Sequence, residues 1–248
     1  MRKIQVFVMA MLAIAAVVPV CAMDTDELVA KAIEAMGGEK AIKAVKSMKT
    51  TGKFMASGME FPFATYHLRP NQMRLEAEVM GAQMIQCYDG EAGWTINPMT
   101  GTSEPQKMSP IELKGFKLQA DMDGSLIDWK KKGYTIEYIG TDDVEGTETH
   151  QLKLDTNDGI VMDMYFDTEY FLLLKVHTKV TEGENEHESD TYMSDYKEIG
   201  DLVSAHAIET RIGDQVVNQI LLETVELDAE IDKSIFAMPE KQEAAAEE

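Results

Sequence analysis

Cysteine is scarce in this chain of 248 residues, which contains only two. Cys21 lies in an N-terminal apolar stretch with the features of a removable leader, so Cys87 would be the one cysteine left after processing. A single cysteine excludes an intrachain disulfide framework. Cys87 lies between Gln86 and Tyr88 in a segment with strand character, which favours a buried structural thiol over a nucleophile.

Positive charge is also in short supply, with 23 Lys and Arg against 44 Asp and Glu and a formal net charge of −21. Without residues 1–22, which hold Arg2 and Lys3, the balance becomes 21 − 44, or −23. So acidic a surface repels nucleic acid and anionic lipid headgroups. We therefore expect no nucleic-acid partner and no binding through a basic patch.

The sequence lacks the short motifs of common catalytic sites, with no Gly-x-Ser-x-Gly elbow, Walker loop or dinucleotide fingerprint. Two acidic runs, 121–124 and 155–159, lack the closing glutamate of a calcium loop and are better explained as turns. No histidine has a second one three or four residues away, the spacing of a helical zinc site. We predict no catalytic residue, no metal and no cofactor. The five histidines are His67, His150, His177, His187 and His206.

Long hydrophobic runs are absent except for residues 6–20, which follow the positive residues Arg2 and Lys3 and precede small residues at Ala22. This pattern is typical of a secretory signal peptide and is shorter than the ~20 residues of a membrane span. We predict a signal peptide over 1–22, cleaved near Ala22, and export of the remaining chain. Lipid attachment at Cys21 is an alternative, but the bulky Val20 before it argues against this.

The remaining chain is predicted to form one domain over 23–239, followed by a disordered acidic tail over 240–248. Helical periodicity is confined to 24–36, 39–47, 109–121 and one turn near 232–236. Extended segments separated by turn signals fill the rest, as expected of a large antiparallel sheet. A few short helices cannot cover one face of so many strands, so the sheet must curl. We predict a mainly β, α+β fold: a half-open antiparallel β-barrel of about 11 strands, with short helices covering an apolar cavity.

Alternation within the predicted strands gives the candidate cavity lining, because successive strand residues point to opposite faces. Methionine adds to the argument: 18 in the chain minus three in the leader leaves 15, and flexible Met side chains re-pack around ligands of variable shape. Met also serves as ordinary core filler, which is the simpler interpretation of any single one. The residues predicted to line the cavity are Met73, Leu75, Ala77, Val79, Ile160, Met162, Met164, Phe166, Leu172, Leu174 and Val176.

The most specific stretch lies between Tyr66 and Gly101, where turn and strand signals follow in an uncommon order. Each element alone is generic, but together they resemble the LolA/LolB-like superfamily of periplasmic lipoprotein carriers. The closing segment IDKSIFAMP, residues 231–239, is similar to the end of that family's sequences. The elements that carry the resemblance are Leu68-Arg69-Pro70, Met73-Arg74-Leu75-Glu76, Asp89-Gly90, Trp94 and Asn97-Pro98.

The resemblance implies a half-open barrel whose apolar cavity receives lipoprotein acyl chains or other lipid, with an inner-membrane donor and an outer-membrane acceptor as partners. It further implies that Arg69, which precedes Pro70, holds lid helices closed through hydrogen bonds to their backbone. Leu68 departs from the basic residue common in the family, and the chain is longer and more acidic, which leaves the cargo open. The alternatives are a lipid-responsive envelope sensor of the same fold and a periplasmic hydrolase with a nonlocal site.

Overall fold

The structure is a computed structural model that describes residues 23–100 and 104–239. The predicted signal peptide over 1–22 and the predicted tail over 240–248 lie outside the described residues. Three α-helices are present in this part of the chain: α1 (Thr25–Ala35), α2 (Glu39–Ala44) and α3 (Pro110–Ala120). None of the described helices is long and apolar enough to cross a membrane.

Thirteen strands form one continuous antiparallel sheet that stays open between its edge strands, β6 and β7. The strand order is β6-β5-β4-β3-β2-β1-β13-β12-β11-β10-β9-β8-β7, two meanders joined where β1 pairs with β13. The first meander contains β1 (Ser47–Ala56), β2 (Met59–Leu68), β3 (Gln72–Val79), β4 (Ala82–Tyr88), β5 (Gly93–Ile96) and β6 (Gln106–Lys107). The second contains β7 (Thr135–Val144), β8 (Thr147–Asp155), β9 (Ile160–Asp167), β10 (Leu173–Glu182), β11 (Asn185–Ile199), β12 (Leu202–Ile212) and β13 (Gln215–Leu227).

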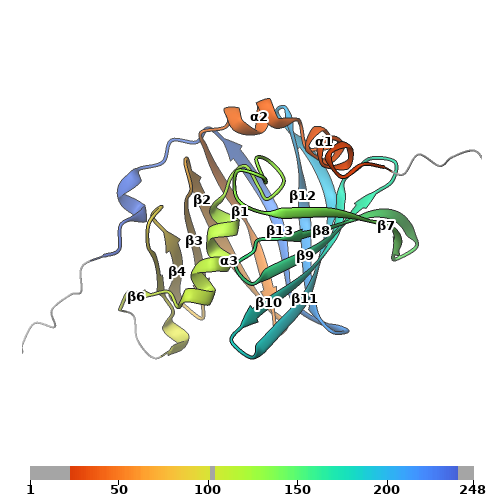
Figure 1. The fold of residues 1–248 in the computed structure, drawn as a ribbon. Coiled ribbons are helices and arrows are strands. Elements are labelled where there is room, and N and C mark those ends of the chain that lie inside the picture. The colour runs from red at the N-terminus through yellow and green to blue at the C-terminus, as the bar shows by residue number, and fades with distance from the viewer. Residues whose placement is uncertain (1–22, 101–103, 240–248) are drawn as a thin grey trace, which may run out of the picture.

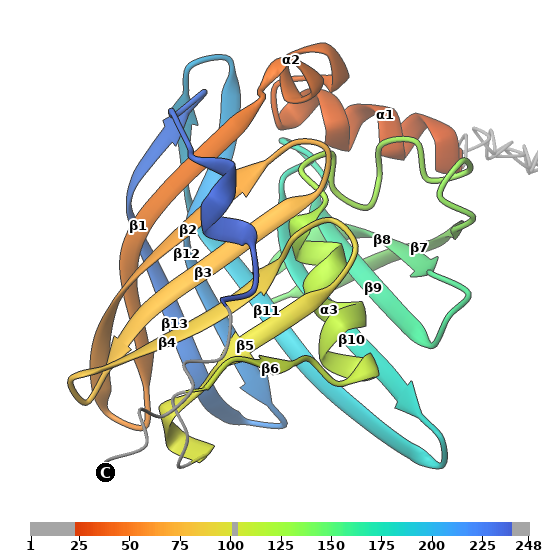
Figure 2. The ribbon, with the colours of Figure 1, turned by 90° about the vertical axis from the view of Figure 1, so that its left-hand side faces the viewer.

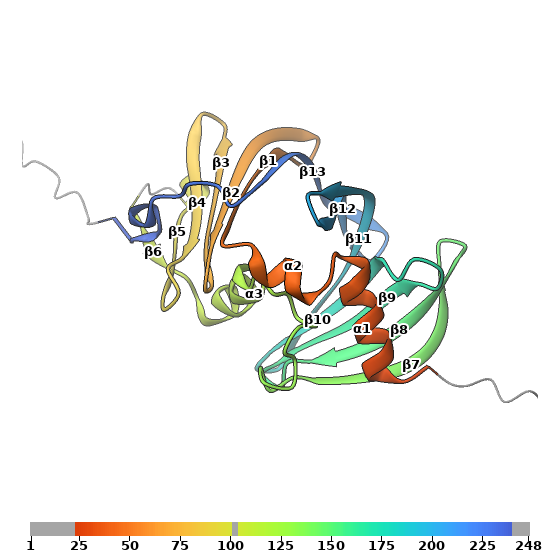
Figure 3. The same cartoon turned by 90° about the horizontal axis from the view of Figure 1, so that it is seen from above.

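Seen from above, the sheet bends into an arc with all three α-helices on its inner side (Figure 3). Figure 1 shows α1 and α2 along the upper rim and α3 inside the arc. Two short 3-10 helices, η1 (Pro98–Thr100) and η2 (Lys233–Phe236), complete the elements. The predicted half-open barrel with short helices is confirmed. The described residues form thirteen strands where about 11 are predicted, and the two-residue β6 is too short to be recognised from periodicity alone.

Helix boundaries follow local capping chemistry. Ser109 forms a capping box with Glu112, and Pro110 occupies the first turn of α3, where its missing N–H costs nothing. At α1, Asp24 is the N-cap residue as expected, but its side chain makes no capping hydrogen bond. The helix ends at Ala35, and Gly37 and Gly38 beyond its C-cap residue Met36 adopt positive φ.

Two buried clusters attach the helices to opposite ends of the concave face. Leu28, Val29 and Ala32 of α1 pack against β7 to β10 in what we call the α1 cluster. Full burial of one such side chain, for example that of Leu28, stabilises the fold by about 1.5–3 kcal/mol. At the other end, Phe116 and Ala120 of α3 pack on β3 and β4 in the α3 cluster, which is Met73, Tyr88, Met108, Phe116 and Ala120.

The C-terminal segment covers part of the convex face instead. Figure 2 shows η2 lying across β2 and β3 on the outside of the sheet. Phe236 packs there with Ile85, Cys87 and Trp94, and its carbonyl oxygen accepts a hydrogen bond of 2.9 Å from the indole nitrogen of Trp94. Burial raises the pKa of the Cys87 thiol to about 12, so Cys87 is a structural thiol, as the sequence predicts.

Candidate functional site

Apolar side chains continue along the concave face between the two helix-covered ends. Strand register places them on one face, because directly opposed residues project to the same side. Phe61 of β2 opposes Phe54 of β1, which opposes Ile220 of β13; Ile220 in turn opposes Ile208 of β12. A neighbouring row runs through Phe63, Gly52 and Leu222. We call this surface the central strip: Phe54, Phe61, Phe63, Ile208, Ile220 and Leu222.

The central strip is less well covered than its flanks. All six of its side chains are half-buried, and none belongs to the clusters that pack under α1 and α3. At one side it meets the α1 cluster through Met193, which opposes Ile208 and packs against that cluster. At the other side Phe63 opposes Ala77, which opposes Met84. The strip is thus a continuous apolar surface across four strands, β2, β1, β13 and β12.

The β3 residues predicted to line a cavity all share the concave face. Met73 is buried in the α3 cluster and Leu75 packs against it, so α3 already covers both. Ala77 and Val79 lie further along β3, where Ala77 neighbours Phe63 of the central strip. The structure therefore divides these four residues into two that anchor a helix and two that border the strip.

The residues of β9 and β10 predicted to line the cavity also divide, into those that pack under α1 and those that do not. Met164, Phe166 and Val176 are core residues of the α1 cluster, and Met162 packs against it. Ile160 borders a cavity of about 670 Å³ beside α3. Leu172 is half-buried and precedes β10.

A bulge between Leu173 and Lys175 interrupts the alternation of side chains in β10, so Leu174 does not take the cavity-lining position that the sequence predicts. The bulge aligns Leu173 with Phe166 on the concave face. Leu174 instead lines a cavity of about 490 Å³ together with Tyr192, Arg211 and Leu221, and Ile208 of the central strip also borders it. An extra residue in a strand shifts the following side chains by one position, which a period-two pattern in a sequence cannot reveal.

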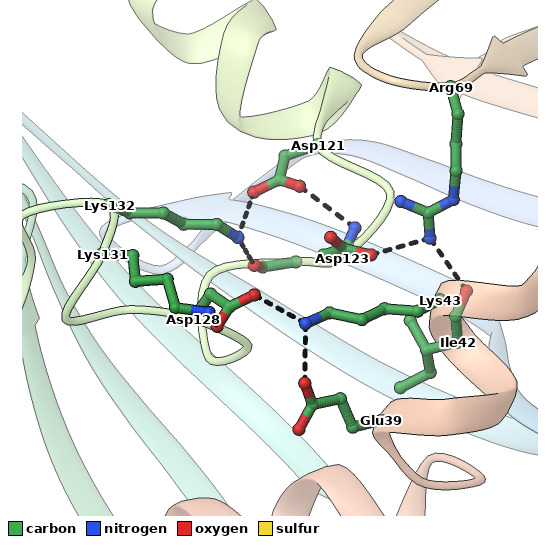
Figure 4. Close-up of polar contacts among 10 residues, drawn as sticks. Glu39, Ile42, Lys43, Arg69, Asp121, Asp123, Asp128, Lys131 and Lys132 are labelled. Carbon is green, nitrogen blue, oxygen red and sulfur yellow. Dashed lines mark hydrogen bonds and ion pairs between the residues drawn. The ribbon is translucent and has the colours of Figure 1, made fainter.

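At the upper rim, Arg69 joins three segments that are distant in the sequence. Its Nε donates to the carbonyl oxygen of Val45 at 2.6 Å and its Nη2 to that of Ile42 at 2.9 Å, so it binds the last turn of α2. The same Nη2 lies 2.7 Å from Oδ1 of Asp123 in the loop after α3. Figure 4 shows the guanidinium between α2 and this loop. Charge-assisted contacts of this kind are stronger than neutral ones.

A second ion pair links the same two segments. Nζ of Lys43 lies 2.6 Å from Asp128 and also binds Glu39 one turn earlier in α2 (Figure 4). Hydrogen bonds from Lys131 and Lys43 lower the pKa of Asp128 to about 2. We call α2 together with the 121–134 loop the lid.

The loop itself is held together internally. Lys132 binds the carboxylate of Asp121 and the carbonyl oxygen of Gly124, while Asp121 also accepts from the backbone N–H of Asp123. This acidic run is therefore a turn, and the same holds near Asp155, whose carboxylate accepts from the backbone N–H of Asn157. The described residues contain no group of three His, Cys, Asp or Glu placed to hold a metal ion.

The arrangement closest to a catalytic pair is His177 with Asp190, 2.9 Å apart. It lies on β10 and β11, and Lys175 also binds Asp190 at 3.2 Å. A nucleophilic site further requires a hydroxyl or thiol bonded to the imidazole. Among the hydrogen bonds of the described residues, none joins His177 to a serine, threonine or cysteine. The pair lies on the convex face beside Lys175, which shares Asp190 with it.

Comparison with known proteins gives no match to any family model and none to a curated protein. Solved structures do match. A LolA superfamily protein from Nitrosomonas europaea is 11% identical, with a TM-score of 0.60 over 87% of this chain and 98% of that one. A putative outer membrane lipoprotein-sorting protein domain from Vibrio parahaemolyticus is 11% identical, with a TM-score of 0.55 over 85% of this chain and 94% of that one.

A third similar structure is a DUF1329 family protein from Desulfovibrio piger, 10% identical, with a TM-score of 0.58 over 86% of this chain and 97% of that one. At identities this low the likeness shows the fold alone. It agrees with the open antiparallel sheet and the helices on its concave side. The protein therefore has a LolA-like fold.

Proposed function

We propose that the protein is a noncatalytic periplasmic carrier that binds the acyl chains of a lipoprotein or another lipid on the central strip. The observation that carries this proposal is the half-buried row from Phe61 through Ile220 to Ile208, which lies between two packed ends and beside a lid held by polar contacts. Partly exposed apolar side chains gathered in one contiguous surface are typical of a binding site. The LolA-like fold and the predicted signal peptide support the same conclusion.

The energetics suit transport. Each CH₂ transferred from water to the strip contributes about 0.8 kcal/mol, so a single long chain provides a large driving force. Release then needs an acceptor of comparable affinity, such as a membrane or a membrane-bound protein. We propose an inner-membrane donor and an outer-membrane acceptor for these two steps.

Native mass spectrometry of protein purified from its own cell envelope tests the proposal. The expected result is a co-purified species with the mass of a lipid or an acylated peptide. Absence of any such species, together with failure to bind a fluorescent fatty acid, would overturn it.

Two adjacent residues of β13 provide a matched pair of variants. Ile220 lies on the central strip, while Leu221 is 41% exposed and projects to the other face. Ile220→Glu should weaken fatty-acid binding at least tenfold, because a carboxylate on an apolar binding surface must be desolvated. Leu221→Glu should leave the affinity within about twofold. Equal effects of the two variants would place the ligand elsewhere.

A further inference from the structure

Several buried polar side chains lie among the apolar ones on the concave face where the strands approach the lid. Thr50, Thr65, His67 and His206 are all less than 10% exposed. Thr50 opposes Thr65, and His67 lies two residues further along β2 on the same face. His206 precedes Ile208 of the central strip by two residues on β12, so it too projects to the concave face. The apolar strip therefore has one polar end.

His67 is the unusual member of this group. It is 8% exposed, and its Nδ1 atom is buried without a hydrogen-bond partner among the described residues. On the concave face it is flanked by Met48 of β1 and Met73 of β3, neither of which offers a strong hydrogen-bonding group. Burial lowers its pKa to about 4, so the imidazole is neutral at pH 7.

Buried polar atoms in folded proteins nearly always have partners, because an unpaired one carries the full cost of its desolvation. An unpartnered nitrogen at the end of an apolar binding surface is explained if the ligand brings the partner. The required group is polar and uncharged, since a neutral imidazole cannot compensate a buried carboxylate or ammonium. At the lid, the cationic groups of Arg69 and Lys43 are already paired with Asp123 and Asp128.

On these grounds, and resting on the proposed function, we propose that His67 is a specificity-determining residue that donates a hydrogen bond from Nδ1 to the carbonyl oxygen of the ester or amide linkage of an acyl lipid. The linkage then lies beneath the lid, and the chain extends along β2 past Thr65 and Phe63 to Phe61. The path from His67 to Phe61 is roughly 20 Å long at about 3.3 Å per residue. The residues from Phe61 along β2 to Arg69, which follows the strand, thus form a series from apolar through polar to charged.

A pair of probes with the same chain tests the inference. 1-Palmitoylglycerol has the ester carbonyl, and 1-O-hexadecylglycerol has an ether oxygen in its place. Both are titrated against a bound environment-sensitive dye. The wild-type protein should bind the ester about tenfold more tightly than the ether, the size expected for one buried hydrogen bond. His67→Phe should reduce this preference to within twofold and leave the ether affinity nearly unchanged.

His177→Phe is the matched control, because His177 lies on the convex face and pairs with Asp190; it should keep the tenfold preference. Should His67→Phe fail to fold, the wild-type protein suffices: the imidazole ¹⁵N signals of His67 should shift with the ester and not with the ether. Equal binding of ester and ether, or equal effects on these signals, would overturn the assignment of His67. Failure of both probes to bind would instead overturn the proposed function.

Discussion

Arg69 and Asp123, 54 residues apart in the chain, are joined by a 2.7 Å ion pair at the rim of the sheet. Through the same side chain, the end of β2 is also bound to the last turn of α2. The LolA-like resemblance implies this kind of contact for Arg69, since it places lid helices under the control of that residue. The loop that contains Asp123 is a second segment that Arg69 binds, in addition to α2.

Arg69→Leu removes three hydrogen bonds from the lid while keeping an apolar side chain of moderate size. We expect faster amide exchange over residues 39–45, because each lost contact to a charged donor is worth about 1.5–3 kcal/mol. Cargo should still bind, but transfer to an acceptor membrane should slow. Arg211→Leu, on the convex face, is the control. Unchanged exchange and unchanged transfer in the Arg69 variant would remove this residue from the mechanism.

His67 should make stability depend on pH in a defined window. Its pKa in the folded protein is lowered from 6.5 to about 4 by burial, so between these values the unfolded chain binds more protons. The contribution of a neutral His67 is fully present above about pH 6.5 and is lost as the pH falls toward 4, by about 3 kcal/mol in total.

Urea unfolding at pH 7.5 and pH 4.5 measures this contribution. The wild-type protein should lose about 2–3 kcal/mol more than His67→Phe between these two conditions. Parallel behaviour of the wild-type protein and His67→Phe would show that His67 is not buried as a neutral imidazole.

Glycine is required at position 52 because neighbouring atoms leave no room for a side chain, and not because of its backbone φ angle. A methyl group there would collide with the carbonyl oxygen of Leu221 and lie 2.9 Å from the ring of Phe63. Gly52→Ala should therefore destabilise the fold by about 1–3 kcal/mol or more. At Gly115 of α3, an added methyl group would meet no atom within 4 Å, so Gly115→Ala should stabilise by about 0.5–1 kcal/mol. Thermal unfolding distinguishes the two, and a neutral Gly52→Ala would contradict this packing.

Phe236 attaches the C-terminal segment to the convex face. It is 1% exposed and packs on Trp94 and Cys87, so Phe236→Ala should lower the free energy of unfolding by about 3–5 kcal/mol. Met238 lies two residues later and is 38% exposed. Met238→Ala should change the free energy of unfolding by no more than about 0.5 kcal/mol. Denaturant titration of both variants measures the difference. A small effect at Phe236 would mean that the segment contributes little to stability.

The sequence predicts the architecture well because strand alternation is a local signal. The one-sided pattern of β3, from Met73 to Val79, identifies the concave face correctly, and Ser109 with Glu112 marks the start of α3. The alternation fails at Leu174, where the bulge changes the register. Phe61 and Phe63 have the same two-residue period as β3, so this local signal also marks the central strip, although the predicted lining does not include it.

The lid could not be predicted in the same way. Asp123 and Asp128 lie in an acidic chain where any carboxylate is a plausible partner, and their distances in sequence from Arg69 and Lys43 give no local pattern. The buried position of His67 likewise depends on the covering elements and not on its neighbours in β2. The ligand-binding roles of the candidate residues remain predictions.

Photo-crosslinking of a palmitate analogue with a mid-chain diazirine, followed by peptide mass spectrometry, tests the central claim most directly. The protein is labelled at a stoichiometric concentration of the analogue, with unmodified palmitate as competitor. We predict competitor-sensitive adducts on the peptides that contain Phe54, Phe61 and Ile220. Adducts confined to convex residues such as Tyr192, or labelling that the competitor does not reduce, would contradict an acyl chain on the central strip.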